Sequence, residues 1–373
     1  MSGKDYMPLT LDEKISLLKE VGEEIIDLDE LRELIQWKTD HNEEIYAYDG
    51  FEPSGVLHIG QGLLRAINVN KITKAGIKFK FLVADWHAAA NLKFGGDLEV
   101  IKKVGDFLIE TWKVCNMDLT NVEFIYASDL VKEPPYWELV LKIAINSSLS
   151  RVKRCTQIMG RSESENLAAS QILYPLMQAA DIFYLPADIC QLGMDQRKVN
   201  MLAREVSKKL NKPKPVSIHH HMLMGLYKPP TTDLKGVDRT IEIKMSKSDP
   251  DSAIFMLDSP NDVKRKINKA YCPPKQIVEN PVLEYCKYII FELIDEFRVK
   301  RPEKYGGNVE YSTYEELEKD YQKGKLNPPD LKPAVIEYLN QLLSPVIKHF
   351  KEDPKAHELY EFVQAEYKKY KNN

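Results

Sequence analysis

Two short motifs far apart in the chain carry residue types suited to work on a nucleoside triphosphate. Residues 58–61 read His-Ile-Gly-Gln and open a predicted helix, and residues 244–248 read Lys-Met-Ser-Lys-Ser in a polar loop. A helix N-terminus after a turn offers free backbone N–H groups and the positive end of its dipole to a phosphate. His58 can donate a hydrogen bond to phosphate oxygens, and Gly60 permits the close approach of a flat base.

The lysines of the second motif supply mobile positive charge. Lys244 and Lys247 can stabilise the charge that develops when a carboxylate attacks the α-phosphate of ATP and pyrophosphate leaves. This chemistry requires no general base. Each motif alone also fits an ordinary structure, a capped helix start or a solvated basic loop. The two motifs together, in this order, favour nucleotide chemistry.

A third group of polar residues indicates the second substrate. Tyr174, Gln178 and Asp181 are spaced i, i+4 and i+7, so they project from one face of a helix. This face is either a solvated stripe or the wall of a pocket. With Tyr48 on a predicted strand, and Gly50 leaving room beside it, Asp181 would suit the hydroxyl group of a tyrosine substrate, and glutamine oxygens would suit its ammonium group. Bound phenylalanine would leave Asp181 unpaired, which is a strong form of rejection.

The elements that must position these residues alternate along the chain. Strand-like and helical segments follow one another at 45–51 (strand), 57–74 (helix), 78–85 (strand), 97–114 (helix) and 122–127 (strand), with further helices at 137–147, 164–181 and 195–210. This order predicts an α/β fold with a Rossmann-like, doubly wound parallel sheet. Its ligand crevice is expected at the carboxyl ends of the strands, beside the turn that precedes His58 and beside Asp85 and His87.

A length of 373 residues predicts two domains with a short preface. We expect a helical preface at 1–40 and a Rossmann catalytic domain at 41–260, with a helical connective segment at about 105–190. Residues 227–239 read as a surface insertion. Strand signals vanish after this domain, so residues 261–373 are expected to form a helical C-terminal domain.

Composition narrows the class of protein. Hydrophobic residues make up 43% and charged residues 29% of the chain, and no apolar run approaches the roughly 20 residues of a membrane helix. The N-terminus has no signal-peptide pattern. We therefore expect a cytoplasmic protein without a membrane partner. A net charge of −4 weakens nonspecific RNA binding but does not exclude a specific RNA partner.

No protein-bound structural metal is expected. The five cysteines are widely spaced and never form Cys-x-x-Cys, which argues against a zinc site and a disulfide framework. Residues 219–221 are three consecutive histidines, and neighbours on a strand point to opposite faces, so they cannot all face one ion. Magnesium is expected to arrive with ATP, because the sequence offers no carboxylate cluster as a cage.

The first two motifs resemble the HIGH and KMSKS signatures of class I aminoacyl-tRNA synthetases, although Gln61 replaces the usual second histidine. Residues 48–55, 174–181 and 195–198 further resemble archaeal and eukaryotic cytosolic tyrosyl-tRNA synthetases. The resemblance extends over nearly the whole chain. Tryptophanyl enzymes share the class motifs and remain a minor rival.

This resemblance implies a tyrosine–tRNA ligase that forms tyrosyl-adenylate from tyrosine and Mg-bound ATP and then loads tRNA(Tyr). It implies catalytic roles for His58, Lys244 and Lys247. Expected ATP contacts are His58, Gly60, Gln61, Lys244, Met245, Ser246, Lys247 and Ser248. The expected tyrosine contacts are Tyr48 and Asp181 at the phenol, Tyr174, Gln178 and Gln196 at the amino group, and Gly50.

Contacts with the tRNA acceptor stem are expected near residues 195–198. Arg197 and Lys198 fall in the first turn of a predicted helix with Asp195 as its cap. Two cations there oppose the helix dipole, which suggests that they face an anion or RNA, although an exposed basic turn is the alternative. The arginine at the matching position in the family meets the first base pair of the stem. Arg154 and Met201 complete the expected acceptor-stem set.

The C-terminal region resembles the helical anticodon-binding domain of this family at residues 300–307 and 326–332. Tyr305 would act as a stacking platform for a base, and Asp330 as an acceptor for a guanine edge. Asn327 stands where archaeal members often have histidine, and it completes the expected anticodon set.

Family likeness also implies a homodimer with its interface around residues 108–150. Two functions from other classes compete with this interpretation. A nucleotidyltransferase that does not use tRNA would share the first motif, but not the long C-terminal region or the second motif. A non-catalytic RNA-binding protein derived from a synthetase would be expected to have lost His58, the loop lysines or the polar pocket residues, all of which are present.

Overall fold

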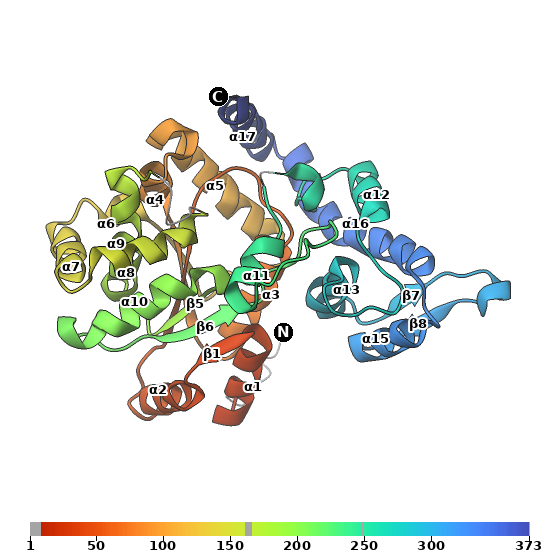
Figure 1. Ribbon diagram of the computed structural model, residues 1–373, viewed down its shortest axis with the longest axis horizontal. Coiled ribbons are helices and arrows are strands. Elements are labelled where there is room, and N and C mark those ends of the chain that lie inside the picture. The colour runs from red at the N-terminus through yellow and green to blue at the C-terminus, as the bar shows by residue number, and fades with distance from the viewer. Residues whose placement is uncertain (1–8, 161–165, 248, 373) are drawn as a thin grey trace, which may run out of the picture.

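A six-stranded sheet lies at the centre of the N-terminal part of the molecule (Figure 1). The computed structural model describes residues 9–160, 166–247 and 249–372. The strands are β1 (Glu24–Ile26), β2 (Tyr46–Phe51), β3 (Lys78–Val83), β4 (Val122–Tyr126), β5 (Ile189–Gly193) and β6 (Val216–His220). Their order is β1-β6-β5-β2-β3-β4; β2 to β6 run parallel, and β1 is antiparallel to β6. The predicted doubly wound parallel sheet is confirmed.

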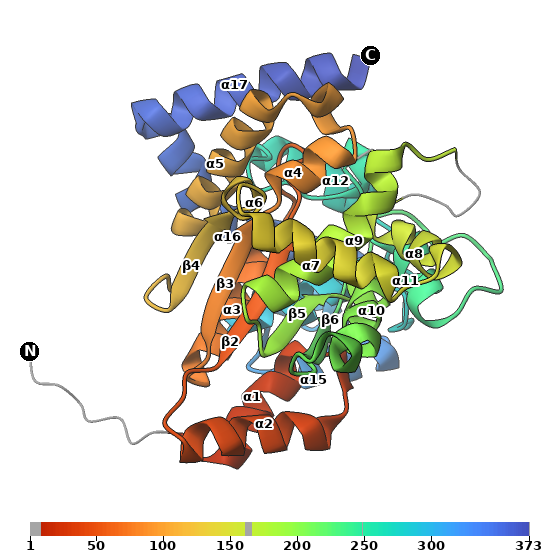
Figure 2. The same cartoon turned by 90° about the vertical axis from the view of Figure 1, so that its left-hand side faces the viewer.

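Helices cover both faces of this sheet, as a mainly parallel sheet requires. They are α1 (Leu11–Val21), α2 (Leu28–Asp40), α3 (Leu63–Lys74), α4 (Asp85–Ala90), α5 (Leu98–Val114), α6 (Ala127–Leu130), α7 (Pro134–Ile145), α8 (Leu149–Cys155), α9 (Ala169–Tyr184), α10 (Arg197–Ser207) and α11 (Gly236–Ile243). On one face Phe79 and Phe81 join the core of α3 and α5. On the other, Tyr48 and Leu82 join the core of α7, α9 and α10, and Figure 2 shows α7 and α9 in front of the strands.

The strand order reverses between β2 and β5. The chain goes from β2 outward to β3 and β4, whereas β5 and β6 lie on the other side of β2. A ligand crevice opens at such a switch point, beyond the carboxyl ends of the strands. Phe51 ends β2 and Gly193 ends β5, so these two ends frame the expected site.

Two expectations for the N-terminal part need correction. The expected helical preface also contributes a strand, because β1 extends the sheet with Ile25 opposite Ile218. The helix predicted from residue 57 begins only at Leu63, since residues 58–62 form a turn in which the N–H groups of Gln61 and Gly62 both donate to the carbonyl of His58. The predicted insertion at 227–239 is largely exposed and leads into α11.

The chain after the sheet is mostly helical, as predicted, but it also contains a strand pair. Its helices are α12 (Pro260–Lys269), α13 (Pro281–Tyr285), α14 (Phe291–Leu293), α15 (Tyr314–Lys323), α16 (Pro328–Glu352) and α17 (Pro354–Asn372). The strands β7 (Phe297–Val299) and β8 (Val309–Tyr311) form an antiparallel hairpin, so the expectation of no strands here was wrong. Each is three residues long, too short for an alternating pattern to stand out.

The last helix returns to the N-terminal part of the molecule. In Figures 1 and 2, α17 lies beside α5. The ring of Phe107 on α5 lies 5.2 Å from that of Phe350 and 6.0 Å from that of Tyr360, measured between centroids. One hydrophobic core therefore continues from the sheet into the C-terminal helices. None of the helices described is long and apolar enough to cross a membrane.

The three consecutive histidines have three different sets of partners. His219 contacts Glu24, and His220 contacts Arg65. His221 Nδ1 lies 3.1 Å from a carboxylate oxygen of Glu23, and its Nε2 lies 3.1 Å from one of Glu284 on α13. Burial opposes a charge on His221, but the two carboxylates outweigh it and raise its pKa to about 9. A charged His221 thus joins the N-terminal segment to the C-terminal helices.

The ion pairs of His221 with Glu23 and Glu284 should make the protein more stable at low pH than at high pH. A pKa raised on folding gives stabilisation that is complete below the unfolded value of about 6.5 and is lost as pH rises through about 9. We expect His221→Gln to lower the Tm by about 2–5 °C at pH 6.5 and by less at pH 9.5, measured by thermal unfolding. The exposed His41→Gln serves as control, and an equal loss at both pH values would contradict this account.

Candidate active site

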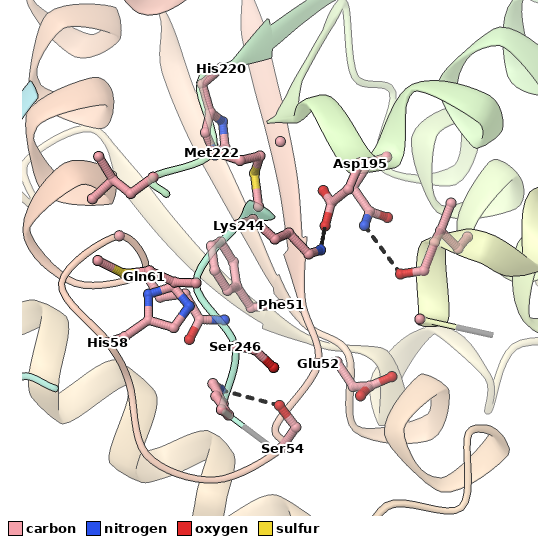
Figure 3. Close-up of a pocket in the computed structure, with 18 of the residues that line it drawn as sticks. Phe51, Glu52, Ser54, His58, Gln61, Asp195, His220, Met222, Lys244 and Ser246 are labelled. Carbon is pink, nitrogen blue, oxygen red and sulfur yellow. Dashed lines mark hydrogen bonds and ion pairs between the residues drawn. The ribbon is translucent and has the colours of Figure 1, made fainter. Parts of the chain in front are cut away.

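A cavity of about 300 Å³ opens at the carboxyl ends of β2 and β5 (Figure 3). Both sequence motifs and part of the polar pocket line it. The lining includes Gly50, Glu52, Ser54, His58, Gly60, Gln61, Tyr174, Gly193, Asp195, Gln196, Lys244, Met245, Ser246 and Lys247. The fold therefore brings together segments nearly 200 residues apart, at the edge where the crevice was expected.

The first motif is held by the chain that follows the second. The N–H of Ile59 donates to the carbonyl of Ile254 at 2.9 Å, and His58 forms a β-bridge with Phe255. A Cβ at Gly60 would lie 3.2 Å from the His58 ring, so a side chain there would crowd the imidazole. His58 Nδ1 is buried and has no hydrogen-bond partner within the described ranges. This nitrogen is available to a ligand.

The main-chain carbonyl of Gln61 has a hydrogen-bond partner, whereas its side-chain oxygen has none among the residues described. Its carbonyl accepts a 2.8 Å hydrogen bond from the indole N–H of Trp112 on α5. Its side-chain Oε1 is buried without a partner among the residues described. The main chain thus anchors the motif, while the side-chain oxygen faces the cavity wall.

The second motif is anchored at its middle. Met245 is buried, and its N–H donates to the carbonyl of Leu223 at 2.8 Å. Ser246 lines the cavity, and Ser248 lies outside the described residues. A buried methionine between two lysines fixes the loop to the core and leaves the lysines on the cavity side.

The two lysines have different partners. Lys244 forms an ion pair with Asp195, toward which it is directed in Figure 3. The Nζ of Lys247 donates to the hydroxyl of Ser54 at 3.2 Å. The charge of Lys244 is therefore balanced by a protein carboxylate, whereas Lys247 has a neutral hydroxyl as its partner. Asp195 binds this lysine and does not act as the predicted helix cap, because α10 has Gln196 at that position without a side-chain bond.

Burial sets the charge states of the cavity. Burial and the nearby charges of Lys247 and Lys244 lower the pKa of His58 to about 3, so the imidazole is neutral near pH 7. Burial and the charge of Lys93 lower the pKa of Lys247 to about 7, against the opposing effect of Glu52. An anion bound beside Lys247 would favour its charged form and raise this pKa again.

Asp181 is the centre of a buried polar cluster behind the cavity. Its two oxygens accept from the hydroxyl of Tyr136 at 2.8 Å and from that of Tyr48 at 3.4 Å, and His87 Nε2 lies 2.9 Å away. Tyr48 and Asp181 are fully buried and do not line the cavity. A Cβ at Gly50, which does line it, would lie 2.9 Å from the Tyr48 hydroxyl. The predicted pair is thus adjacent to the cavity, behind a glycine.

Tyr136 was not predicted as a site residue from the sequence. It lies 45 positions before Asp181, on α7, where no spacing pattern connects the two residues. His87 was expected only near the crevice. It is buried within the cluster, its ring 5.1 Å from that of Tyr174, and Asp181 raises its pKa against the opposing effect of burial.

The residues expected to bind the amino group of tyrosine lie at or just behind the cavity wall, and two of them are linked by a hydrogen bond. Tyr174 and Gln196 line the cavity. The amide of Gln178 donates to that of Gln196 at 3.1 Å, and the amide of Gln196 donates to the carbonyl of Ile158 at 3.3 Å. Gln178 therefore lies behind Gln196 and orients it.

A buried ion pair below the cavity was also not predicted. Asp49 on β2 lies 3.4 Å from the guanidinium of Arg65 on α3, and both are buried. Arg65 also contacts Gln191 on β5 and His220 on β6. Burial raises the pKa of Asp49 to about 7, although Arg65 opposes the shift. This network fixes α3 to three strands and so positions the first motif.

The residues expected at the acceptor stem lie on α8 and α10, and two of them have protein partners. Arg197 forms a 2.8 Å ion pair with Glu24 of β1, and Lys198 donates to Gln157. Arg154 is exposed, and Met201 is half-buried. The pairing of Arg197 was invisible in the sequence because Glu24 lies 173 residues away, on the strand that was not predicted.

The residues expected at the anticodon lie at the far end of the C-terminal helices. Tyr305, in the connection between β7 and β8, is 61% exposed. Asn327 is the N-cap residue of α16, and Asp330 lies in its first turn. Arg301 donates to the carbonyls of Gly307 at 2.9 Å and Lys325 at 2.8 Å, so it links the loop of Tyr305 to the segment before Asn327.

Comparison with known proteins gives consistent matches. A family model described as tRNA synthetases class I (W and Y) matches residues 39–344. The cytoplasmic tyrosine–tRNA ligase 1 of Arabidopsis thaliana is 49% identical over 358 residues, 95% of this chain and 89% of the plant protein. A tyrosine–tRNA ligase of Thermococcus sibiricus is 41% identical, and the match covers 95% of this chain and 99% of the archaeal protein. The structure of tyrosyl-tRNA synthetase complexed with L-tyrosine from Pyrococcus horikoshii matches with a TM-score of 0.87 and 40% identity, over 95% of this chain and 100% of that one.

Proposed function

The chain belongs to the class I tyrosyl-tRNA synthetases, and from this premise we propose how its residues carry out the reaction. It is a tyrosine–tRNA ligase, which activates tyrosine with ATP and transfers it to the terminal adenosine of tRNA(Tyr). This assignment replaces the alternatives of a nucleotidyltransferase that does not use tRNA and of a non-catalytic RNA-binding protein.

Activation takes place in the cavity between the two motifs. The carboxylate of tyrosine attacks the α-phosphate of ATP, an oxygen–phosphorus bond forms, and the bond to pyrophosphate breaks. Neutral His58 donates a hydrogen bond to a phosphate oxygen, and Lys247 stabilises the charge on the leaving pyrophosphate. The observation that carries this proposal is that Lys247 reaches Ser54, in the turn just before His58, within one cavity. Lys244 exchanges Asp195 for the triphosphate when ATP binds.

Magnesium enters as part of the ATP complex. The remaining ATP contacts come from Gly60 and Gln61 in the first motif, and from Ser246 and Ser248 in the second. Met245 contributes by fixing the loop, because its N–H is bonded to the Leu223 carbonyl.

The phenol of tyrosine is recognised by the buried pair behind Gly50. Tyr48 and Asp181 are held 3.4 Å apart, a long hydrogen bond that a substrate hydroxyl can replace by bonding to both residues. Phenylalanine offers no such group, and breaking the pair without a new partner would cost free energy. The ammonium group is bound by Tyr174 and by Gln196, which Gln178 orients.

Transfer requires the tRNA to lie along both parts of the molecule. Arg154, Arg197, Lys198 and Met201 contact the acceptor stem beside the cavity. Arg197 can do so by exchanging Glu24 for a phosphate or a base edge, because this ion pair is partly exposed.

The C-terminal part binds the anticodon. Tyr305, Asn327 and Asp330 contact its bases, with the exposed Tyr305 ring as the stacking platform. Residues 41–260 thus carry catalysis, and residues 261–373 recognise the anticodon. We place the enzyme in the cytoplasm, as the name of the Arabidopsis relative indicates for that protein.

The enzyme acts as a homodimer through α7 and the start of α8. Leu141, Ile145 and Leu149 are 60%, 81% and 65% exposed. Neighbouring large apolar side chains with this exposure indicate a surface that another protein covers. These residues lie within the segment around 108–150 expected at the interface, whose first residue, Leu108, is buried in the core of its own chain.

The proposed role of Lys247 can be tested by substitutions that remove its charge or keep it. We expect Lys247→Ala to slow adenylate formation by about 10²–10³-fold with little change in tyrosine affinity, measured by pyrophosphate exchange and equilibrium binding. In the native enzyme kcat/KM for ATP should fall as pH rises through about 7, because the unprotonated amine carries no charge. Lys247→Arg, which stays charged, should lose this dependence.

The exposed Lys228→Ala is the matched control for these variants. Unchanged activation kinetics in Lys247→Ala would remove the loop from the mechanism. A pH profile that is the same in Lys247→Arg and the native enzyme would show that another group titrates.

The dimer is tested by sedimentation at micromolar concentration. The native protein should sediment at about twice the chain mass of 43.0 kDa, and Ile145→Asp should shift it toward the monomer, because burying an unpaired carboxylate in an apolar interface is costly. Val278→Asp, at a site that is 77% exposed elsewhere on the surface, should leave the mass unchanged. A native protein of 43.0 kDa would contradict the proposal.

A further inference from the structure

The last helix of the chain touches the catalytic loop. The hydroxyl of Tyr367, on α17, donates a 2.9 Å hydrogen bond to the main-chain carbonyl of Lys247. These residues are 120 positions apart, and the bond joins the C-terminal end of the chain to the loop that carries the lysine of the activation step.

The ring of Tyr367 also packs against the turn that Lys247 reaches. Gly55 in that turn has a φ of +120°, and a Cβ at this position would lie 2.6 Å from the Tyr367 ring. The neighbouring Ser54 accepts the hydrogen bond from Lys247 Nζ at 3.2 Å. Tyr367 therefore makes two contacts. Its hydroxyl bonds to the main chain of Lys247, and its ring packs against the turn to which the Lys247 side chain is hydrogen-bonded.

The helix that carries Tyr367 is fixed independently of the loop. The ring of Tyr370 lies 5.1 Å from that of Phe94, and Lys103 on α5 lies 4.3 Å from the centroid of the Phe362 ring. These contacts with the N-terminal part hold α17 on both sides of Tyr367. The helix can thus serve as a rigid support.

The side of the loop that faces α17 borders a second cavity. This cavity of about 300 Å³ lies between the loop and α17, and its lining includes Lys247, Phe255, Tyr360 and Tyr367. Atoms that face a cavity lack packing partners there, so packing restrains the loop only weakly on this side. The hydroxyl of Tyr367 spans the gap.

We propose that Tyr367 is a positioning residue that holds the main chain of Lys247, so that the ammonium group is directed into the active site before ATP arrives. The inference rests on the role proposed above for Lys247. A catalytic group whose position is fixed in advance does not have to be ordered in the transition state, and this lowers the barrier. Tyr367 itself does not touch the reacting atoms.

Tyr367→Phe is the sharpest test, because it removes the hydroxyl and keeps the ring against Gly55. We expect kcat of tyrosine-dependent pyrophosphate exchange to fall roughly 10-fold, the loss that a single hydrogen bond supports, with the KM for tyrosine unchanged. The Tm should stay within about 2 °C of the native value. Tyr370→Phe, on the same helix but packed on Phe94, should keep native kcat.

A double variant separates positioning from a general structural effect. In a Lys247→Ala background, Tyr367→Phe should change kcat by less than about 2-fold, because the group that it positions is gone. A full 10-fold loss in that background, or native kcat in the single variant, would overturn the proposal. Absence of tyrosine-dependent exchange in the native enzyme would instead refute the proposed function itself.

Discussion

The structure of the site depends on one constraint, the satisfaction of a fully buried carboxylate. Asp181 has no exposed surface, and burying an ionised group is tolerable only when hydrogen bonds and opposite charges surround it. Its partners come from three separate elements: Tyr48 from β2, Tyr136 from α7 and His87 from α4. Together they fix α9 against the sheet at the strand order reversal. The carboxylate that we propose to select the substrate hydroxyl is therefore also one that holds this polar cluster together.

The loop that carries Lys244 and Lys247 also holds charges away from water, here positive ones, and each of them has a partner. Lys244 and Lys247 are partly withdrawn from water, and each is held by a group from a distant segment, Asp195 or Ser54. Burial lowers the pKa of Lys247, so the free enzyme holds this charge at a cost that a bound triphosphate removes. The hydrogen bond from Tyr367 adds a fixed point on the main chain. In the proposed mechanism, activation thus depends on contacts that reach from the turn after β2 to α17.

The sequence predicted what local spacing and order can encode. The parallel sheet followed from alternating elements, and the shared face of α9 followed from the spacing of Tyr174 and Asp181. Partners distant in sequence could not be predicted, among them Tyr136 for Asp181 and Glu24 for Arg197. The strands β1, β7 and β8 were missed because three residues cannot display an alternating pattern. The expected roles in tRNA binding came mainly from family resemblance, and only the placement of Arg197 and Lys198 against the helix dipole pointed to an anion or RNA from the residues themselves.

We propose that the buried pair of Tyr48 and Asp181 selects tyrosine for activation. The most direct measurement is pyrophosphate exchange by the native protein with tyrosine, tryptophan or phenylalanine as the only amino acid, and without tRNA. We expect exchange with tyrosine alone, because only its hydroxyl can replace the buried hydrogen bond between the two residues. Exchange that favours tryptophan or phenylalanine, or no exchange with any of the three, would contradict it.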